Sequence, residues 1–157
     1  MKITDKLYKE TIVSLKGENR TDIIHELLDH LVNYNYLDHA AKLFSFIDSK
    51  ESFNSSYIGK GVAFPHSISK EIKELVCILG ISKSGIFYDK DDIYPCHIIL
   101  LSLSPENKPD IHRKFISKFQ ILLSDVQLKD NIINFISLDN VEKLLSNWEI
   151  QQKEKPL

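Results

Sequence analysis

At 157 residues the chain has the length of one ordinary domain, enough to enclose a full hydrophobic core. Its 43% hydrophobic and 27% charged residues are typical of a globular protein and exclude a natively disordered chain. A formal net charge of −2, with no dense run of Lys and Arg, gives no reason to expect nucleic acid or an anionic membrane as a partner.

Neither the cysteines nor the apolar runs point to a secreted or membrane protein. Two cysteines, Cys77 and Cys96, are too few for a disulfide framework. The first 15 residues lack the apolar core of a signal peptide, and no apolar run is long enough to cross a bilayer. We therefore expect a cytoplasmic protein that meets a membrane only through its partners.

The first third of the chain predicts a short strand, at residues 11–15, followed by two helices. Asn19 and Thr21 are candidate caps for the first helix. Its expected buried residues recur at helical spacing and are Ile23, Ile24, Leu27, Leu28 and Leu31. Those of the second helix are Ala40, Ala41, Leu43, Phe44 and Ile47.

The character of the chain changes after the second helix. Residues 52–61 are loop-like, with two glycines that can take unusual backbone angles, and residues 62–64 predict a brief strand. Pro65 has a fixed φ and biases Phe64 towards an extended backbone. We therefore expect His66 to be presented from a stiff, exposed turn.

The second half predicts two strands and then three helices. The apolar runs 75–81 and 98–103 are typical of strands buried on both faces, with a polar turn or hairpin at 87–92 between them. A helix is expected to open at Asp110, a second to cover 126–136, and a third to be capped by Ser137 or Asp139.

The order of these elements predicts an α/β fold. We expect a layered sandwich in which helices flank both faces of a mixed, mostly parallel sheet, although the pattern does not determine the strand order. No internal repeat or domain-length linker interrupts the chain. The prediction is therefore a single domain over 1–150 with a polar, frayed tail at 151–157.

The segment around His66 has the composition of an anion-binding loop. Gly59 and Gly61 allow the backbone to turn tightly, and nearby hydroxyls could donate to an anion; they belong to Ser55, Ser56 and Ser67. A neutral imidazole is a competent nucleophile near pH 7. From these residues alone, an ordinary solvated loop histidine remains the alternative.

Other polar residues give weaker signals. Asp89, Asp91 and Asp92 fit a solvated turn better than a cation site, since no further ligand pattern accompanies them. Three histidines, His25, His30 and His39, lack metal-ligand spacing. We expect neither a metal nor a cofactor.

Residues 59–66 read GKGVAFPH, which resembles the G-x-G-[IV]-A-[hydrophobic]-P-H motif of enzyme IIA domains of the mannitol/fructose class. That family includes the stand-alone nitrogen-regulatory IIA proteins. Residues 137–145 are similar to its closing helix, so the resemblance covers nearly the whole chain. It implies that His66 accepts a phosphoryl group from the phosphocarrier protein HPr or its nitrogen-branch counterpart. It also implies that His112, otherwise an ordinary residue at a helix start, sits beside His66.

The chain departs from the family pattern upstream of the motif. Where the family usually has Arg-Glu, this chain has Lys50-Glu51, and lysine keeps the charge without a bidentate fork. Ser55-Ser56-Tyr57 replaces Ser-Thr-Gly, and Lys60 replaces a frequent Asn. The residues expected around the phosphate are Lys50, Ser55, Ser56, Gly59, Gly61 and Ser67.

By this resemblance the chain is a phosphotransferase-system component that relays a phosphoryl group through His66 to a IIB partner in fructose- or mannitol-type sugar uptake. The alternative is a regulatory IIA whose phosphorylation switches its binding to target proteins. A degenerate IIA-like domain that no longer takes phosphate is the third reading.

Overall fold

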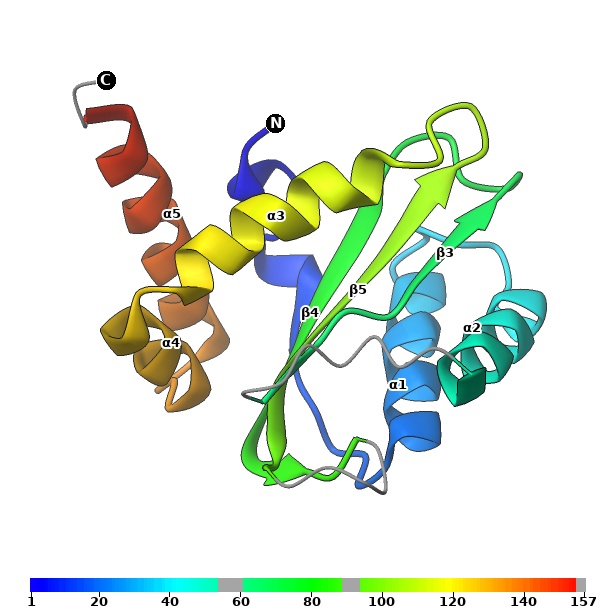
Figure 1. Cartoon of the computed structure of the whole chain (residues 1–157), viewed down its shortest axis with the longest axis horizontal. Coiled ribbons are helices and arrows are strands. Elements are labelled where there is room, and N and C mark those ends of the chain that lie inside the picture. The colour runs from blue at the N-terminus through cyan, green and yellow to red at the C-terminus, as the bar shows by residue number, and fades with distance from the viewer. Residues whose placement is uncertain (54–60, 89–93, 155–157) are drawn as a thin grey trace.

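The computed structural model describes residues 1–53, 61–88 and 94–154 of the chain (Figure 1). Five strands and five α-helices make up this part of the chain, preceded by two short 3-10 turns, η1 (Ile3–Asp5) and η2 (Lys9–Thr11). The strands are β1 (Ile12–Ser14), β2 (Val62–Ala63), β3 (His66–Ser69), β4 (Val76–Ile86) and β5 (Cys96–Pro105). The helices are α1 (Arg20–Asn33), α2 (Ala41–Phe53), α3 (Ile111–Leu123), α4 (Val126–Ile133) and α5 (Leu138–Glu154).

All five strands belong to one mixed sheet of order β1-β4-β5-β2, with β3 also paired to β5. The β4–β5 pair is antiparallel and the other three pairings are parallel. β2 and β3 pair with successive parts of β5, since Val62 lies opposite Ile98 and His66 opposite Ser102. Together they form one edge of the sheet, interrupted where Phe64 and Pro65 separate the two strands.

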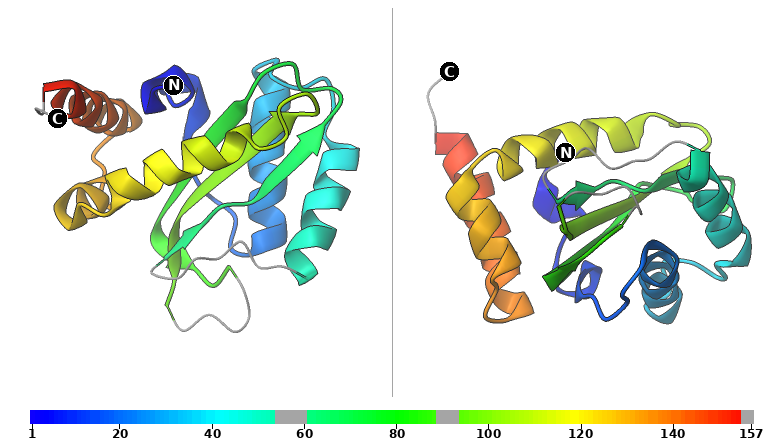
Figure 2. Two further views of the ribbon diagram at one scale, coloured as in Figure 1. Left: turned by 45° about the horizontal axis from the view of Figure 1, so that its top comes forward. Right: turned by 60° about the horizontal axis from the view of Figure 1, so that its bottom comes forward.

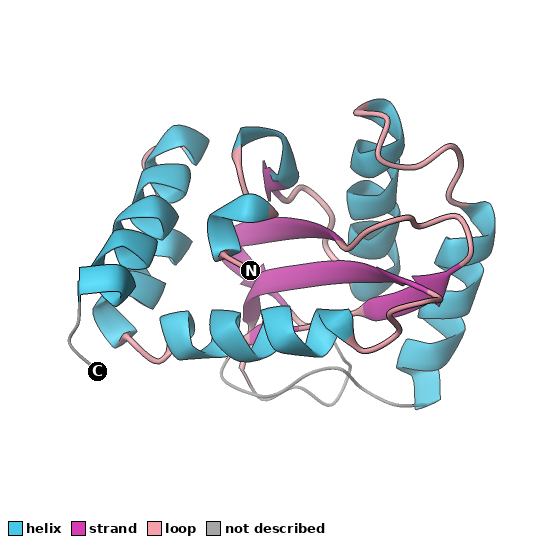
Figure 3. Cartoon of the chain, turned by 90° about the horizontal axis from the view of Figure 1, so that it is seen from above, coloured by secondary structure: helices cyan, strands magenta, loops and turns pink. Residues whose placement is uncertain are grey.

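Helices cover both faces of this sheet, as Figures 2 and 3 show. Alternate residues of β5 point to opposite faces, because side chains alternate along a strand. Ile98 and Leu100 join the core beneath α3, α4 and α5, whereas Ile99 and Leu101 join the core beneath α1 and α2. The predicted α/β sandwich with a mixed, mostly parallel sheet is confirmed.

The helix caps follow local chemistry. Asn19 caps α1, with its side-chain oxygen accepting the N–H of Asp22 at 2.9 Å, and the other candidate, Thr21, lies inside the helix. At α5 the cap is Ser137, whose hydroxyl accepts the N–H of Asn140 at 3.2 Å. Asp139 lies in the first turn of that helix.

The structure differs from the sequence-based expectation at three places. α2 continues to Phe53, into the segment expected to be a loop, and α4 ends at Ile133. α5 runs to Glu154, so the first four residues of the expected polar tail are helical. The N-terminal turns, for which no element was expected, bury Ile3 and Leu7 completely against the α3–α5 side of the core.

None of the helices within the described ranges is long and apolar enough to span a membrane.

Candidate functional site

His66 is the first residue of β3, at the edge of the sheet. Pro65 immediately before it has no N–H to give, but its carbonyl accepts the N–H of Ser102 at 3.1 Å and ties the segment to β5. The expectation of an exposed turn is therefore wrong, because the strand pairing begins at His66 itself and leaves its side chain half-buried.

The ring of His66 is held by its own backbone neighbour. Its Nδ1 lies 3.1 Å from the carbonyl oxygen of Phe64. A carbonyl can only accept a hydrogen bond, so Nδ1 carries the proton of the neutral imidazole. The lone pair of the ring is therefore on Nε2.

His112 stacks on His66. The ring centroids are 4.5 Å apart and the planes are 18° from parallel. His112 lies in the first turn of α3 and is only 4% exposed. Its Nδ1 is 2.9 Å from the hydroxyl of Ser104, which also accepts the His112 backbone N–H at 3.3 Å. Two bonds to one serine thus fix both the ring and the start of the helix.

The surroundings of His112 favour its neutral form. Burial lowers the pKa of His112 below the usual 6.5, and repulsion from Arg113, and from His66 when that ring is protonated, lowers it further. A hydrogen bond to the Pro109 backbone and the carboxylate of Asp110 oppose that shift without reversing it. At neutral pH the stacked pair therefore contains a neutral imidazole at His112.

Two serines of β5 complete this side of the sheet, and the sequence-based analysis did not single them out. Ser102 lies directly opposite His66 in the parallel pairing and is fully buried. Its hydroxyl has no hydrogen-bond partner among the described residues. Ser102 and Ser104 alternate with Leu103 in an otherwise apolar strand. Side chains two residues apart share a face of the sheet, so this alternation in the sequence could have indicated a polar patch on one face of β5.

Among the residues expected around the phosphate, Ser67 is placed away from His66. Ser67 lies opposite Leu103, whose side chain belongs to the α1–α2 core, so its hydroxyl is on the reverse face of β3 from His66. Lys50 is part of α2. Ser55, Ser56 and Gly59 lie outside the described residues.

Gly61 is required by the path of the backbone. Its φ is +81°, and a Cβ placed there would lie 2.9 Å from the carbonyl oxygen of Pro95. Its own carbonyl accepts the N–H groups of His97 and Ile98, at 2.9 and 3.1 Å. Gly61 therefore allows β2 to pair with β5, on the same edge of the sheet as His66.

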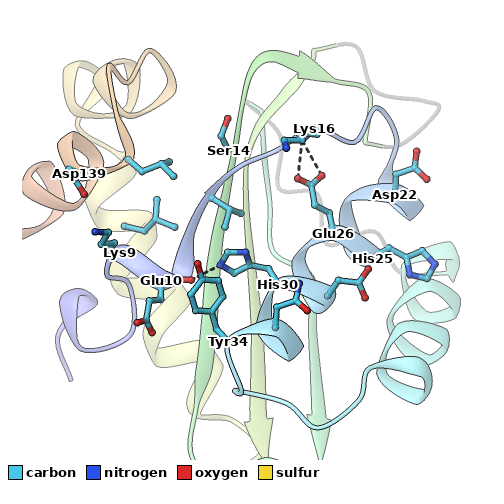
Figure 4. A pocket seen from close by; sticks show the side chains of 15 residues that line it. Lys9, Glu10, Ser14, Lys16, Asp22, His25, Glu26, His30, Tyr34 and Asp139 are labelled. Atoms are coloured by element: carbon cyan, nitrogen blue, oxygen red, sulfur yellow. Dashed lines mark hydrogen bonds between the residues drawn. The ribbon is translucent and has the colours of Figure 1, made fainter.

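A cavity of about 1020 Å³ lies beside β1, at the edge of the sheet opposite His66 (Figure 4). Two of the polar side chains that line it are engaged within the fold. The Glu26 carboxylate accepts the N–H groups of Lys16 and Gly17, and Nε2 of His30 lies 2.7 Å from the Glu10 carbonyl oxygen. In the described part of the chain, no group of three or more His, Cys, Asp or Glu side chains is placed to hold a metal ion.

The family model of the phosphoenolpyruvate-dependent sugar phosphotransferase system, EIIA 2, matches residues 6–148. The chain belongs to this EIIA 2 family. The paired histidines at the edge of the sheet are therefore the candidate site of an EIIA 2 domain.

Two curated relatives differ in the role that their names give. The fructose-specific EIIABC component of Bacillus subtilis (strain 168) is 25% identical over 150 residues, which is 95% of this chain and 24% of that protein. The chain thus spans about a quarter of the length of that relative. A nitrogen regulatory protein of Bradyrhizobium diazoefficiens is also 25% identical, over 126 residues that cover 80% of this chain and 82% of that protein.

Solved structures agree on the fold. The nitrogen regulatory protein IIA-Ntr from Neisseria meningitidis superposes with a TM-score of 0.79 at 22% identity, covering 91% of this chain and 98% of that one. This EIIA 2 chain therefore has the fold of that protein.

Proposed function

We propose that this EIIA 2 protein carries a phosphoryl group on Nε2 of His66. An HPr-type phosphocarrier protein, or its nitrogen-branch counterpart, is the donor, and a IIB partner is the acceptor. The observation that carries the proposal is the bond from Nδ1 of His66 to the Phe64 carbonyl, because it directs the nucleophilic lone pair to Nε2.

The chemistry needs no base and no metal ion supplied by the chain. The Nε2 lone pair of His66 forms a bond to the phosphorus of the donor phosphohistidine, while the donor N–P bond breaks and returns its electron pair to the donor ring. Nδ1 of His66 keeps its proton throughout and donates it in a hydrogen bond to the Phe64 carbonyl. Transfer to the acceptor repeats the exchange in the outward direction. Such a reaction asks the protein mainly for positioning and charge stabilisation.

His112 is the proposed supporting residue. It is stacked on His66 and held by Ser104, so its ring has one orientation beside the transferred group. It also lies in the first turn of α3, where the positive end of the helix dipole favours an anion. Its role is to stabilise the phosphoryl oxygens while His66 makes and breaks the N–P bond.

The transport and regulatory roles use the same site. A phosphoryl group on His66 adds negative charge to one surface patch, which suits either onward transfer or a switch in partner binding. The fructose-system and nitrogen-regulatory relatives are equally similar at 25% identity, so both roles are supported. Sugar uptake by membranes lacking this protein separates them, because lost uptake supports transport and normal uptake supports regulation.

Phosphorylation itself is tested by incubating the chain with phosphoenolpyruvate, enzyme I and HPr and measuring intact mass. We expect the wild type to gain one acid-labile phosphoryl group and His66→Ala to gain none. His39→Ala is the matched control, since His39 is an exposed histidine near the same edge. A wild type that gains no mass refutes the carrier role, and a gain that persists in His66→Ala moves the site elsewhere.

A further inference from the structure

The two stacked histidines differ in the groups that hold their rings. Nδ1 of His66 faces the carbonyl oxygen of Phe64, which can only accept, so this ring keeps one tautomer. Nδ1 of His112 lies 2.9 Å from the hydroxyl of Ser104. A hydroxyl both donates and accepts hydrogen bonds, so it can pair with Nδ1 whether or not that nitrogen carries a proton. The contact with Ser104 therefore suits both the neutral and the protonated ring of His112.

Ser104 can hold the protonated ring without losing its other contact. Its oxygen accepts the backbone N–H of His112 at 3.3 Å, which uses one of the two lone pairs of the hydroxyl. The second lone pair remains for a protonated Nδ1. A hydrogen bond to the Pro109 backbone also favours the protonated ring. His112 can therefore take a proton while its ring stays in place beside His66.

The charged groups around His112 largely cancel one another. Asp110 and Arg113, at the start of the same helix, act on His112 with opposite sign, and they pair with each other at 3.6 Å on the surface. From the sheet, β3 contributes the ring of His66, and β5 contributes Ser104, which does not titrate near neutral pH. Burial is then the main influence on His112, and it favours the neutral ring.

A phosphoryl group on His66 would change this balance. It brings a charge of about −2 to a ring whose centroid is 4.5 Å from that of His112. Because His112 is only 4% exposed, solvent screens this charge weakly. An opposite charge at such a range favours the protonated imidazole and opposes the effect of burial. The preferred state of His112 therefore depends on whether His66 carries the phosphoryl group.

We propose that phosphorylation of His66 is coupled to the uptake of one proton by His112. The inference rests on the proposed function, since the phosphoryl group supplies the charge that attracts the proton. When Nε2 of His66 bonds to phosphorus, Nδ1 of His66 keeps its own proton, and the neutral ring of His112 takes one from solvent. When the phosphoryl group leaves for the acceptor, His112 returns that proton to solvent.

The coupling makes the carrier sensitive to pH. In the pH range where His112 is neutral without the phosphoryl group and protonated with it, the phosphorylated protein binds one proton more. By linkage, acidification within this range favours phosphorylation of His66, and a rise in pH favours release of the phosphoryl group.

NMR of the histidine ring protons of the full chain tests the coupling in a titration from about pH 5.5 to about pH 9. One sample is unphosphorylated, and the other is kept phosphorylated by phosphoenolpyruvate with catalytic amounts of enzyme I and HPr. We expect the pKa of His112 to lie below 6.5 in the first sample and to rise by about one unit or more in the second. The ring signals of His25, which lines the cavity at the opposite edge of the sheet, are the internal control.

A pair of variants separates the effect of charge from that of phosphoryl chemistry. His66→Glu and His66→Gln have side chains of nearly equal size, and only glutamate is negatively charged at neutral pH. We expect a higher pKa for His112 in His66→Glu than in His66→Gln, because a carboxylate stands where the phosphoryl charge would be.

The outcomes distinguish the inference from the proposed function. A chain that gains no phosphoryl group refutes the proposed function, and the coupling falls with it. A phosphorylated chain in which the pKa of His112 has not risen overturns the coupling and leaves the carrier role intact. Equal pKa values for His112 in His66→Glu and His66→Gln likewise overturn the coupling alone.

Discussion

The imidazole rings of His66 and His112 are stacked 4.5 Å apart, although the first begins an edge strand and the second lies in the first turn of a helix. Ser104 of β5 ties the helix to the sheet, because its hydroxyl bonds both to the ring and to the backbone of His112. The site is therefore a junction of β3, β5 and α3. Substitutions of His112 and of Ser104 therefore have distinct expected effects.

Removing the second ring should slow phosphoryl transfer without moving its site. In His112→Ala, His66 keeps its bond to the Phe64 carbonyl, so the same residue should still be modified. The rate should fall by about tenfold or more, because a positioned group beside the phosphoryl oxygens is lost. Rapid-quench phosphorylation by phospho-HPr measures this, with the exposed neighbour Lys114→Ala as control. An unchanged rate would remove His112 from the mechanism.

Removing the Ser104 hydroxyl should destabilise the fold and also impair transfer. Ser104→Ala leaves the buried His112 N–H and Nδ1 without that partner, which should cost roughly 1–3 kcal/mol of unfolding free energy. Urea unfolding measures the loss, and Ser117→Ala on the exposed side of α3 should cost almost nothing. The transfer rate should fall in Ser104→Ala alone. Equal stability of the two variants would contradict the linking role of Ser104.

Stability should depend on pH through His112. Its pKa in the folded protein is below the ordinary 6.5, so the unfolded chain binds more protons between those two values. The stability from this group is complete above the ordinary pKa and is lost as pH falls through the folded pKa. Unfolding free energies of the wild type should therefore decrease on acidification below about pH 6.5. The decrease should be smaller in His112→Gln, and an identical pH profile for the two proteins would refute the assignment.

Gly61 should tolerate no side chain. Gly61→Ala places a Cβ 2.9 Å from the Pro95 carbonyl oxygen at a φ of +81°. Strain of this kind costs about 1–3 kcal/mol, so the thermal midpoint should fall by several degrees. Ser84→Ala, at an exposed position of β4, is the control for thermal unfolding followed by circular dichroism. A midpoint equal to that of the control would show that β2 can shift away from β5.

Much of the fold follows from local sequence. The helical spacing of Ile23, Leu27 and Leu31 places one buried face on α1. The apolar run at 75–81 overlaps β4, which begins one residue later, and the run at 98–103 falls within β5. The caps Asn19 and Ser137 act within three residues of themselves, so their chemistry is visible in the chain. Periodicity and capping depend on near neighbours, which is why the sequence alone predicts them.

Long-range pairing decided the rest. The burial of Ile3 and Leu7 depends on helices near the other end of the chain, so no local sequence pattern predicts it. The register of β3 on β5 turned His66 towards α3 and Ser67 towards α2, although the two residues are consecutive. A difference of one position changes the face because side chains alternate along a strand.

The sequence by itself determined which histidine to consider, because the residues GKGVAFPH form a local pattern that ends at His66. The partner of that histidine was decided by tertiary structure. His112 and Ser104 reach His66 only when α3 packs across the sheet and β3 pairs with β5. A stacked pair with a lowered pKa at His112 arises from burial and from a charge brought close by folding, and neither is a property of any short segment of the chain.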